Sequence, residues 1–330
     1  MSKVYICHTP YHILITLIKT IEDKEKSSIL VYKSLNNYEN IIKKLKESNI
    51  FNEVKLFNCE NDNEFFNLTY EFKYKHLFKH KRVLKKLENT YDFNILKNKD
   101  IYIYNDDSVV GYYMQLAKIN YNLLEDGLDC YKNIDRIYRY NYNIYEKIKR
   151  FLGFGLYRFG NSKYSKTIEV NDKKDINLPI KNKLIEVPRK ELFERLTEKQ
   201  KKLILGIFLQ EDDIIKVIKG NSTLVITQPL FEDKLVDSKE KQIKIYKDIV
   251  QNYSIGKVII KPHPRDTLNY EKYFKDCIVI KEKYIPLEIL NFIPNLKIKR
   301  AVTVFSTAIQ SIDYCDEKIC FGIEWAINHE

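Results

Sequence analysis

The chain has 330 residues, of which 44% are hydrophobic and 31% charged, a composition typical of a soluble globular protein with one large or two ordinary domains. Its formal net charge of +11 permits a nucleic acid, an anionic membrane surface or an anionic substrate as partner, without choosing among them. No apolar run approaches the ~20 residues needed to span a bilayer, which argues against an integral membrane protein.

The first half of the chain alternates short apolar segments with amphipathic ones. The apolar segments are rich in β-branched residues and predict strands at 4–7, 28–32, 54–57, 100–104 and 119–124. Helices are predicted at 13–21 and 38–46, in the basic stretch 72–96, and near residue 109. This alternation predicts a doubly wound parallel sheet. The turn after the first strand has no G-x-G-x-x-G, so the usual dinucleotide-binding fingerprint is absent.

Polar residues follow several of these predicted strands. His8 and His12 come after the first strand, where they either face a ligand or, more commonly, hydrogen-bond the turn. Asp106 or Asp107 is expected to N-cap the helix that begins near Val109.

Glu125-Asp126-Gly127 follows the predicted strand at 119–124. Two neighbouring carboxylates near a low-dielectric surface raise one pKa, which suits a general base. The same residues also make an ordinary acidic turn, with glycine at a position of positive φ. From these residues alone the turn is the more common interpretation, and both stay open.

The stretch 131–164 is basic and rich in tyrosine. It fits contact with an anionic membrane or a second subunit, while a packed helix with a solvated charged face is the commoner use of such a pattern. The polar stretch 173–190 contains Pro179 and Pro188 and has weak periodicity. We therefore expect an N-terminal domain at 1–172, a linker at 173–190 and a C-terminal domain at 191–330.

The second half repeats the alternation. Strands are predicted at 222–227, 258–261, 277–280, 300–305 and 318–322, and helices at 191–210, at 238–253, near Pro286 and after Thr307. The six cysteines form no C-x-x-C pair, and the N-terminus goes directly into a strand. Free thiols in a reducing compartment are therefore expected.

The strand at 258–261 ends in Lys261-Pro262-His263-Pro264. The prolines cannot continue a strand ladder, so they hold His263 on a stiff turn at the edge where open α/β sheets bind ligands. Lys261 and Arg265 lie close by in sequence, which suits a phosphate that needs charge balance and a proton. A rigid corner with an incidental histidine is the alternative.

In their order along the chain, these motifs resemble the bacterial sialyltransferases of glycosyltransferase family 52. The resemblance covers nearly the whole chain. It rests on an acidic-acidic-Gly motif, a His-Pro motif, a later serine motif and two further stretches: Glu125-Asp126-Gly127, His263-Pro264, Ser306-Thr307, Thr227-Gln228-Pro229-Leu230 with Glu232-Asp233 after it, and Ile285-Pro286-Leu287-Glu288. It implies a GT-B fold, in which two Rossmann-like doubly wound domains face each other across a cleft. It also implies an inverting, metal-independent transfer of sialic acid from CMP-sialic acid to a glycan hydroxyl.

The resemblance assigns the donor to the second half of the chain. His263 would donate a hydrogen bond or a proton to the phosphate of the departing CMP. Ser306 and Thr307 would hold the same phosphate, as hydroxyls and N–H groups at a helix start can. Glu288 would accept hydrogen bonds from the ribose hydroxyls. Further substrate contacts are expected from the neighbours of these motifs: Gly127, Gln228, Pro229, Lys261 and Pro264.

The resemblance assigns the proton acceptor to a carboxylate. Asp126 is the first candidate for the base that deprotonates the acceptor hydroxyl, with Glu125 beside it. Asp233, after the Gln-Pro turn, is the candidate in reserve.

The expected substrates are CMP-sialic acid and a galactose-type hydroxyl of a capsule or lipooligosaccharide glycan, with no cofactor, metal or nucleic acid. The expected location is the cytoplasm, with peripheral contact at the inner face of the membrane through 131–164 and a homodimer as open options. Two other functions compete. One is a teichoic-acid-type transferase that uses a CDP-polyol and shares the fold, the His-Pro motif and the CMP leaving group; the Glu-Asp-Gly motif and the small size favour the sialyltransferase. The other is a basic nucleic-acid-binding protein, although no known RNA-binding module is recognisable.

Overall fold

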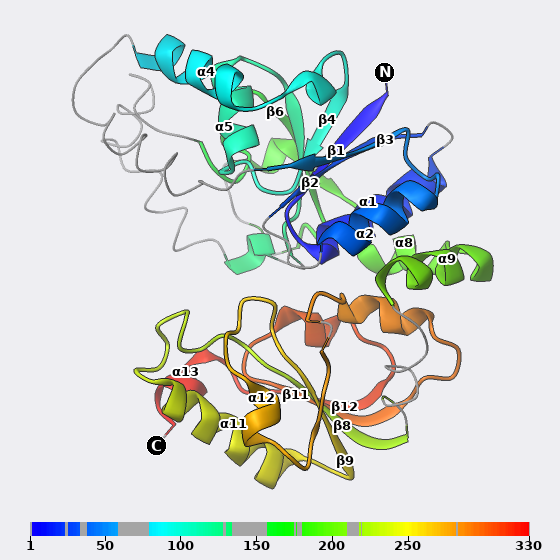
Figure 1. Cartoon of the computed structure of the whole chain (residues 1–330), viewed down its shortest axis with the longest axis vertical. Coiled ribbons are helices and arrows are strands. Elements are labelled where there is room, and N and C mark those ends of the chain that lie inside the picture. The colour runs from blue at the N-terminus through cyan, green and yellow to red at the C-terminus, as the bar shows by residue number, and fades with distance from the viewer. Residues whose placement is uncertain are drawn as a thin grey trace. The chain divides into compact units, whose positions relative to one another are not determined.

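The computed structural model describes residues 2–329 apart from 24–25, 34–37, 59–78, 128–129, 134–156, 175, 177–179, 210–217, 219 and 282. The chain divides into two compact units, Met1–Thr197 and Glu198–Glu330, each built on its own parallel sheet (Figure 1). Each unit has a hydrophobic core of its own. The predicted α/β class with two parallel sheets is thereby confirmed.

Unit 1 contains seven parallel strands in the order β3-β2-β1-β4-β5-β6-β7. Their bounds are β1 Lys3–Cys7, β2 Ser28–Tyr32, β3 Glu53–Phe57, β4 Asp100–Ile103, β5 Tyr121–Leu124, β6 Ser165–Val170 and β7 Leu184–Glu186. The central strands are buried on both faces, as in a parallel sheet that helices cover on both sides. The strand order reverses between β1 and β4, so ligands are expected beyond the carboxyl ends of these two strands.

Helices cover both faces of this sheet. α1 (Pro10–Glu22) and α2 (Tyr38–Glu47) lie on one face, and α4 (Lys79–Thr90) and α5 (Val109–Leu116) lie on the other (Figure 1). Thr9 caps α1 by accepting a hydrogen bond from the backbone N–H of His12, and Pro10 opens the helix. The remaining elements are α8 (Arg189–Glu194) and the 3-10 turns η2 (Asn94–Leu96), η3 (Cys130–Asn133) and η4 (Lys181–Lys183).

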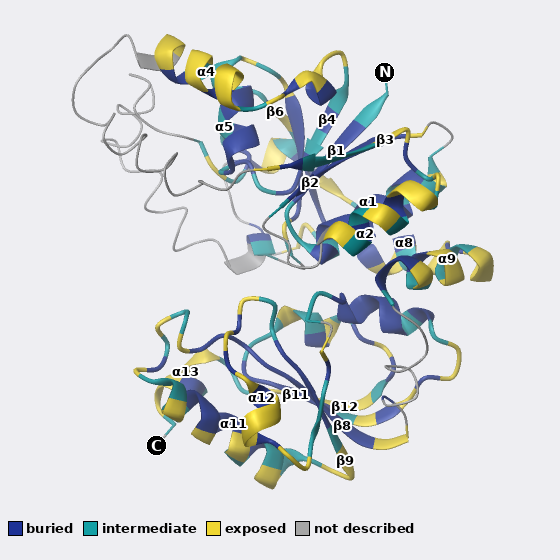
Figure 2. Cartoon of the chain, in the orientation of Figure 1, coloured by how far each residue is buried: buried dark blue, intermediate teal, exposed yellow. Residues whose placement is uncertain are grey.

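Unit 2 contains five parallel strands in the order β10-β9-β8-β11-β12, which reverses between β8 and β11. The strands are β8 Gly220–Ile226, β9 Lys257–Lys261, β10 Ile278–Val279, β11 Ile298–Thr303 and β12 Cys315–Cys320. The helices are α9 Glu198–Phe208, α11 Lys239–Tyr253, α12 Tyr270–Tyr273 and α13 Ile323–Ile327, with 3-10 turns η5 Leu287–Phe292 and η6 Thr307–Gln310. In both units the strands are mostly buried and the outer faces of the helices are exposed (Figure 2).

The boundary between the units differs from the predicted one. The stretch 173–190, expected to be a linker, contains η4, β7 and the start of α8. β7 pairs in parallel with β6, and Leu184 and Ile180 are buried in the core of unit 1. An edge strand of three residues is too short to show a periodicity, so the sequence pattern could not reveal it.

Four helix predictions also need correction. Ser108, and not Asp106 or Asp107, caps α5, since its hydroxyl accepts from the backbone N–H of Gly111 at 3.2 Å. The stretch 191–210 holds two helices, α8 and α9, and Gln210 lies outside the described residues. The segments after Pro286 and Thr307 are 3-10 turns.

Parts of two predicted helical regions, 72–78 and 134–156, lie outside the described residues, so the interpretation of 131–164 as a membrane or subunit contact remains a prediction. Within the described ranges, no helix combines the length and the apolar character that a bilayer crossing requires.

Candidate active site

In unit 1, the carboxyl ends of β1 and β5 bring together two residues far apart in sequence. His12 lies in the first turn of α1, and Asp126 follows β5. His12 Nε2 lies 2.9 Å from the carbonyl oxygen and 2.7 Å from the carboxylate Oδ1 of Asp126. The His12 side chain is fully buried, whereas that of Asp126 is 55% exposed. A buried imidazole therefore holds a carboxylate that reaches solvent.

The hydrogen bonds of His12 determine which ring nitrogen carries the proton. Its Nδ1 accepts from the backbone N–H of His8 at 3.1 Å, so the proton of the neutral ring is on Nε2 and faces Asp126. The ring stacks on Tyr104 with centroids 4.1 Å apart, and the Tyr104 hydroxyl bonds to that of Thr16. Burial alone would raise the pKa of Asp126, but the contacts with His12 lower it below its ordinary value. Asp126 is thus an oriented, ionised carboxylate at neutral pH.

A second carboxylate lies within electrostatic reach of Asp126. Asp107, in the turn between β4 and α5, pairs with Arg158, whose Nε is 3.3 Å from Asp107 Oδ2. Burial raises the pKa of Asp107, Arg158 opposes this effect, and the charge of Asp126 adds to it. The Glu-Asp-Gly turn therefore has an acidic neighbour that its own sequence does not reveal.

Two other carboxylates of this region are buried and accept hydrogen bonds from backbone N–H groups. Glu125 is 2% exposed, and its Oε2 accepts from the backbone N–H of Asn171 at 2.7 Å. Asp106 is 3% exposed and accepts from the backbone N–H groups of Phe159 at 2.8 Å and Gly160 at 3.0 Å. Burial raises the pKa of Asp106 to about 6. Of the Glu125–Asp126 pair, only Asp126 is open to a substrate.

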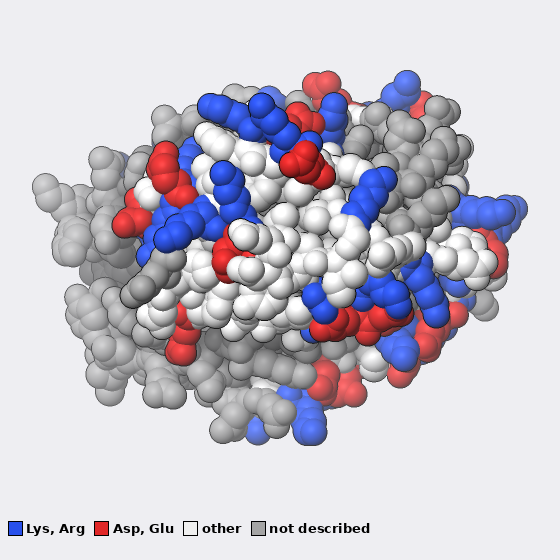
Figure 3. All heavy atoms as spheres, turned by 90° about the horizontal axis from the view of Figure 1, so that it is seen from below, with Lys and Arg blue, Asp and Glu red and all other residues white. Residues whose placement is uncertain are grey.

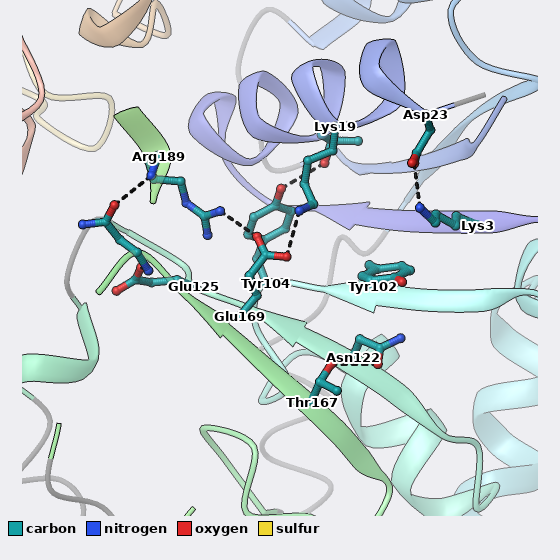
Figure 4. Close-up of polar contacts among 12 residues, drawn as sticks. Lys3, Lys19, Asp23, Tyr102, Tyr104, Asn122, Glu125, Thr167, Glu169 and Arg189 are labelled. Carbon is teal, nitrogen blue, oxygen red and sulfur yellow. Dashed lines mark hydrogen bonds and ion pairs between the residues drawn. The ribbon is translucent and has the colours of Figure 1, made fainter. Parts of the chain in front are cut away.

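A buried ionic cluster joins the helix that carries His12 to the sheet. Glu169 on β6 accepts from Lys19 of α1 at 2.8 Å and from Arg189 of α8 at 2.6 Å (Figure 4). Among the described residues, Nε and Nη2 of Arg189 have no hydrogen-bond partner. One carboxylate thus balances two cations from different helices, the buried Arg189 and the partly buried Lys19.

In unit 2, His263 follows β9 and its ring is held by a backbone contact. The backbone N–H of His263 donates to Thr227 Oγ1 at 3.1 Å. The ring Nδ1 accepts from the backbone N–H of Arg265, also at 3.1 Å. The neutral ring therefore carries its proton on Nε2. Burial lowers the pKa of His263 to about 4, and the charges of Arg265 and Lys261 add to this effect. At neutral pH the unliganded ring is a neutral hydrogen-bond donor.

A buried network supports the turn of His263. Asp266 is 2% exposed and accepts from the hydroxyl of Tyr270 at 2.7 Å, from Gln242 Nε2 at 3.1 Å and from the hydroxyl of Thr227 at 3.3 Å. The Thr227 hydroxyl thus links the main chain of His263 to this network. The turn is fixed by side chains from the residue after β8, from α11 and from α12 together.

The charged neighbours of His263 also form an ion pair or hydrogen bonds within unit 2. Arg265 binds Asp233 through both carboxylate oxygens, at 2.6 and 3.1 Å. Lys261 is 5% exposed and donates to the carbonyl oxygens of Pro262 at 3.1 Å and Lys283 at 2.6 Å. Asp233 therefore orients Arg265, and Lys261 fixes the turn that contains Pro264.

The predicted binding residues at the end of β8 are buried. The Tyr246 hydroxyl accepts from the backbone N–H of Gln228 at 2.5 Å and donates to its carbonyl oxygen at 3.1 Å. Pro229 is buried beside it.

Glu288, in η5, is also buried. It is 6% exposed, accepts a hydrogen bond from the Ser311 hydroxyl at 3.0 Å, and has a pKa that burial raises above its ordinary value.

The hydroxyl residues after β11 make few internal bonds. Ser306 precedes η6 without capping it, and its backbone N–H donates to Thr303 Oγ1 at 3.2 Å. Thr307 is exposed. In unit 1, an added Cβ at Gly127 would meet no atom of the described residues within 4 Å. Ser306 and Gly127 therefore lie beside accessible space.

Comparison with known proteins decides the family of this chain. The sequence model of glycosyltransferase family 52 matches residues 54–325, which include the positions of Asp126, His263 and Ser306. The chain belongs to glycosyltransferase family 52. As a family 52 glycosyltransferase it takes a nucleotide-sugar donor and a glycan acceptor.

Two individual proteins are similar to the chain, one in sequence and one in fold. The family 52 chain is 30% identical over 244 residues to an uncharacterized protein of Haemophilus influenzae, covering 72% of this chain and 75% of the relative. A crystal structure of the Methanocaldococcus jannaschii UDP-GlcNAc 2-epimerase with UDP-GlcNAc and UDP has a TM-score of 0.53 and 16% identity, covering 100% of this chain and 94% of that one. At this identity the likeness shows the fold alone.

Family membership favours the transferase over a nucleic-acid-binding protein. On the face drawn in Figure 3, uncharged side chains occupy the centre, and Lys and Arg are interspersed with Asp and Glu around them. The described residues of that face carry no unbroken basic stripe of the kind that binds a phosphate backbone. The described part of the chain also holds no group of three or more His, Cys, Asp or Glu residues placed to bind a metal.

Sequence reasoning underestimated two residues of the candidate site. His12 precedes the residues that the family model matches, and its partner Asp126 lies 114 positions away. The available signal was its place after the first strand, at the switch point of the sheet. Asp107 was expected only as a helix cap, and its contact with Arg158 crosses about fifty residues of sequence, a separation that no local pattern reports.

Proposed function

We propose that this family 52 glycosyltransferase is an inverting sialyltransferase. It moves sialic acid from CMP-sialic acid to a galactose-type hydroxyl of a cell-surface glycan, in a capsule or a lipooligosaccharide, without a metal ion. The observation that carries the proposal is the turn of His263, where a backbone bond leaves an Nε2–H free to bind the departing phosphate. This turn lies at the carboxyl edge of a parallel sheet, where nucleotides bind in such folds.

The chemistry needs a donor of a proton or hydrogen bond on the leaving group. The bond between the sialic acid anomeric carbon and the phosphate oxygen breaks, and the negative charge of CMP grows. The neutral His263 ring first donates a hydrogen bond from Nε2. A bound phosphate raises the pKa of the ring, because an opposite charge within ~4–6 Å favours the protonated form. The ring then takes a second proton from solvent on Nδ1, giving up the bond from the Arg265 N–H, and passes its Nε2 proton to the phosphate oxygen as general acid.

The same edge of unit 2 offers further donor contacts. The hydroxyl of Ser306, which caps no helix, is available for the phosphate together with that of Thr307. Glu288 has one oxygen held by Ser311 and suits hydrogen bonds to ribose hydroxyls. The raised pKa of Glu288 falls when such donors bind its carboxylate.

The reaction also needs a group that takes the proton of the acceptor hydroxyl. As that oxygen forms its bond to the anomeric carbon, its proton passes to a carboxylate. Asp126 suits this role, because it is ionised, half exposed and oriented by His12. Glu125 is buried and bound to Asn171, and Asp233 is paired with Arg265, so both are weaker candidates for the base.

The decisive experiment measures CMP release from CMP-sialic acid with a panel of galactosides. His263→Ala should lower the transfer rate by about 100-fold or more, the usual size of an acid–base contribution. His329→Ala is the control, since His329 pairs with Asp248 and lies outside the site. Turnover of CDP-glycerol instead of CMP-sialic acid would identify the polyol-phosphate transferase. An unchanged rate in His263→Ala would remove this histidine from the mechanism.

A further inference from the structure

We propose that His12 is a positioning residue for the base: its Nε2–H holds the carboxylate of Asp126 in the orientation that accepts the proton of the sugar hydroxyl. The inference rests on the proposed function, in which Asp126 is the base. It assigns a role to a residue that lies outside the family match at 54–325.

Asp126 needs an external anchor. It is the second residue after β5, its side chain is 55% exposed, and Gly127 follows it without filling the adjacent space. An exposed aspartate on such a turn samples several rotamers. His12 Nε2 lies near the carbonyl oxygen and the carboxylate Oδ1 of the same residue, at 2.9 and 2.7 Å. One N–H group thereby fixes both the main chain and the side-chain direction of Asp126.

His12 is itself held rigidly enough to serve as this anchor. Its side chain is fully buried, its ring lies parallel to that of Tyr104 within 5°, and its Nδ1 accepts from His8. If the ring turned over, Nδ1 would lose the bond from the His8 N–H and Nε2 would move away from Asp126. The ring therefore has one orientation and one tautomer in which both nitrogens are satisfied. Its burial also leaves His12 without access to a substrate, so it acts through Asp126.

Four ionisable groups bear on Asp126. His12 reaches it from α1 and His8 from the end of β1, and both lower its pKa, while Asp107 is a like charge in the turn after β4. Cys130, in η3, has a pKa that burial and nearby acids raise, so it is an uncharged thiol at neutral pH. Losing the His12 contact raises the pKa of Asp126. Since the base works only when ionised, the acid limb of the pH–rate profile then moves to higher pH.

Two substitutions separate the two nitrogens of the ring. The amide of His12→Asn can place an oxygen near Nδ1, which keeps the bond to His8 and loses the donor to Asp126. The amide of His12→Gln can place an N–H near Nε2, which keeps the donor to Asp126 and loses the acceptor for His8. Both variants lose the aromatic stacking on Tyr104, and their side chains differ by one methylene group, so each is the control for the other.

The expected result is a lower kcat for His12→Asn by about 10- to 100-fold, since misplacing a reacting group by ~1 Å costs about 10²-fold. The KM for CMP-sialic acid should stay within about threefold, because the donor is bound by other residues, and the acid limb should shift upward. His12→Gln should stay within about fivefold of wild type and keep the wild-type acid limb. Equal losses in both variants, with unshifted acid limbs, would show that His12 only packs and would overturn the inference.

A second measurement does not depend on activity. The ¹³C signal of the Asp126 carboxyl, followed by NMR against pH, should titrate at higher pH in His12→Asn than in wild type and His12→Gln. An identical titration in all three proteins would refute the positioning role. Asp126→Asn serves as the reference for the proposed function: if it retains wild-type transfer, the base assignment fails while the NMR result still judges the His12 contact.

Discussion

Replacing Glu169 by glutamine should strongly destabilise unit 1. The substitution keeps the shape of the side chain but leaves Lys19 and Arg189, with side chains only 15% and 3% exposed, without their counter-charge. Arg189 already has two N–H groups without partners among the described residues, so it has little capacity to compensate. Breaking a buried ion pair by removing one partner typically costs about 3–5 kcal/mol. For a domain of this size, that corresponds to a fall in Tm of about 6–20 °C.

The measurement is thermal unfolding of Glu169→Gln at pH 7, with Asp23→Asn as the matched control. Asp23 accepts from Lys3 at 2.7 Å in the same unit, but the two side chains are 29% and 34% exposed (Figure 4). A solvated pair of this kind is worth at most about 1 kcal/mol, so the control should change little. Equal Tm values for the two variants would refute the assignment of a buried ionic cluster to this position.

The effect should also depend on pH in a defined direction. Burial alone would raise the pKa of Glu169, but Arg189 and Lys19 together lower it below its ordinary value. The folded state therefore binds this proton less readily than the unfolded state, and the stabilisation is present above the ordinary pKa of about 4.3. It is lost as the pH falls through the lowered value. The difference between wild type and Glu169→Gln should thus shrink on acidification below about pH 4.

Two further pairs of substitutions give predictions: the first separates donor binding from stability, and the second compares two glycines. Ser306→Ala should raise the KM for the CMP donor by about 10- to 150-fold with an unchanged Tm, since Ser306 caps no helix and a bond to a charged group is worth about 1.5–3 kcal/mol. Ser238→Ala, which removes the N-cap of α11, should instead lower stability by about 1 kcal/mol and leave that KM unchanged; the opposite pattern would contradict both assignments. Gly111→Ala should destabilise unit 1 by about 1–3 kcal/mol, because the new Cβ would lie 2.4 Å from the Asp106 carbonyl oxygen. Gly206→Ala, where no atom of the described part of the chain lies within 4 Å of the new Cβ, should stabilise α9 by up to about 1 kcal/mol, and a loss there would contradict the helix-propensity argument.

Much of the fold could be predicted from sequence, because buried parallel strands are continuous apolar runs. The strand at 28–32 was predicted with the bounds of β2, and β9 differs from its prediction only by including Lys257. Failures occurred where a contact distant in sequence overrides a local preference. Asp106 has the chemistry of a helix cap, but Phe159 and Gly160 occupy its carboxylate, and Ser108 takes the cap instead.

The sequence predicted which residues belong to the candidate site better than it predicted which of them contact one another. Strand ends with carboxylates or histidine pointed to Asp126 and His263, and the family result supports a transferase that contains them. The pattern could not show that Glu125 is internal while Asp126 is open, because adjacent residues after a strand face opposite ways. Nor could it show that His12 contacts Asp126, since that contact depends on the order of strands in the sheet.

The bond between His263 Nδ1 and the amide of residue 265 has an evolutionary consequence. Because the donor is main chain, the imidazole keeps its tautomer whichever side chain occupies position 265. Arg265 can therefore be replaced by other residues in homologues that use other sugar donors or glycan acceptors. Proline alone is forbidden, since it lacks the amide hydrogen. In homologous chains, the residue two places after the motif histidine should thus vary widely while never being proline.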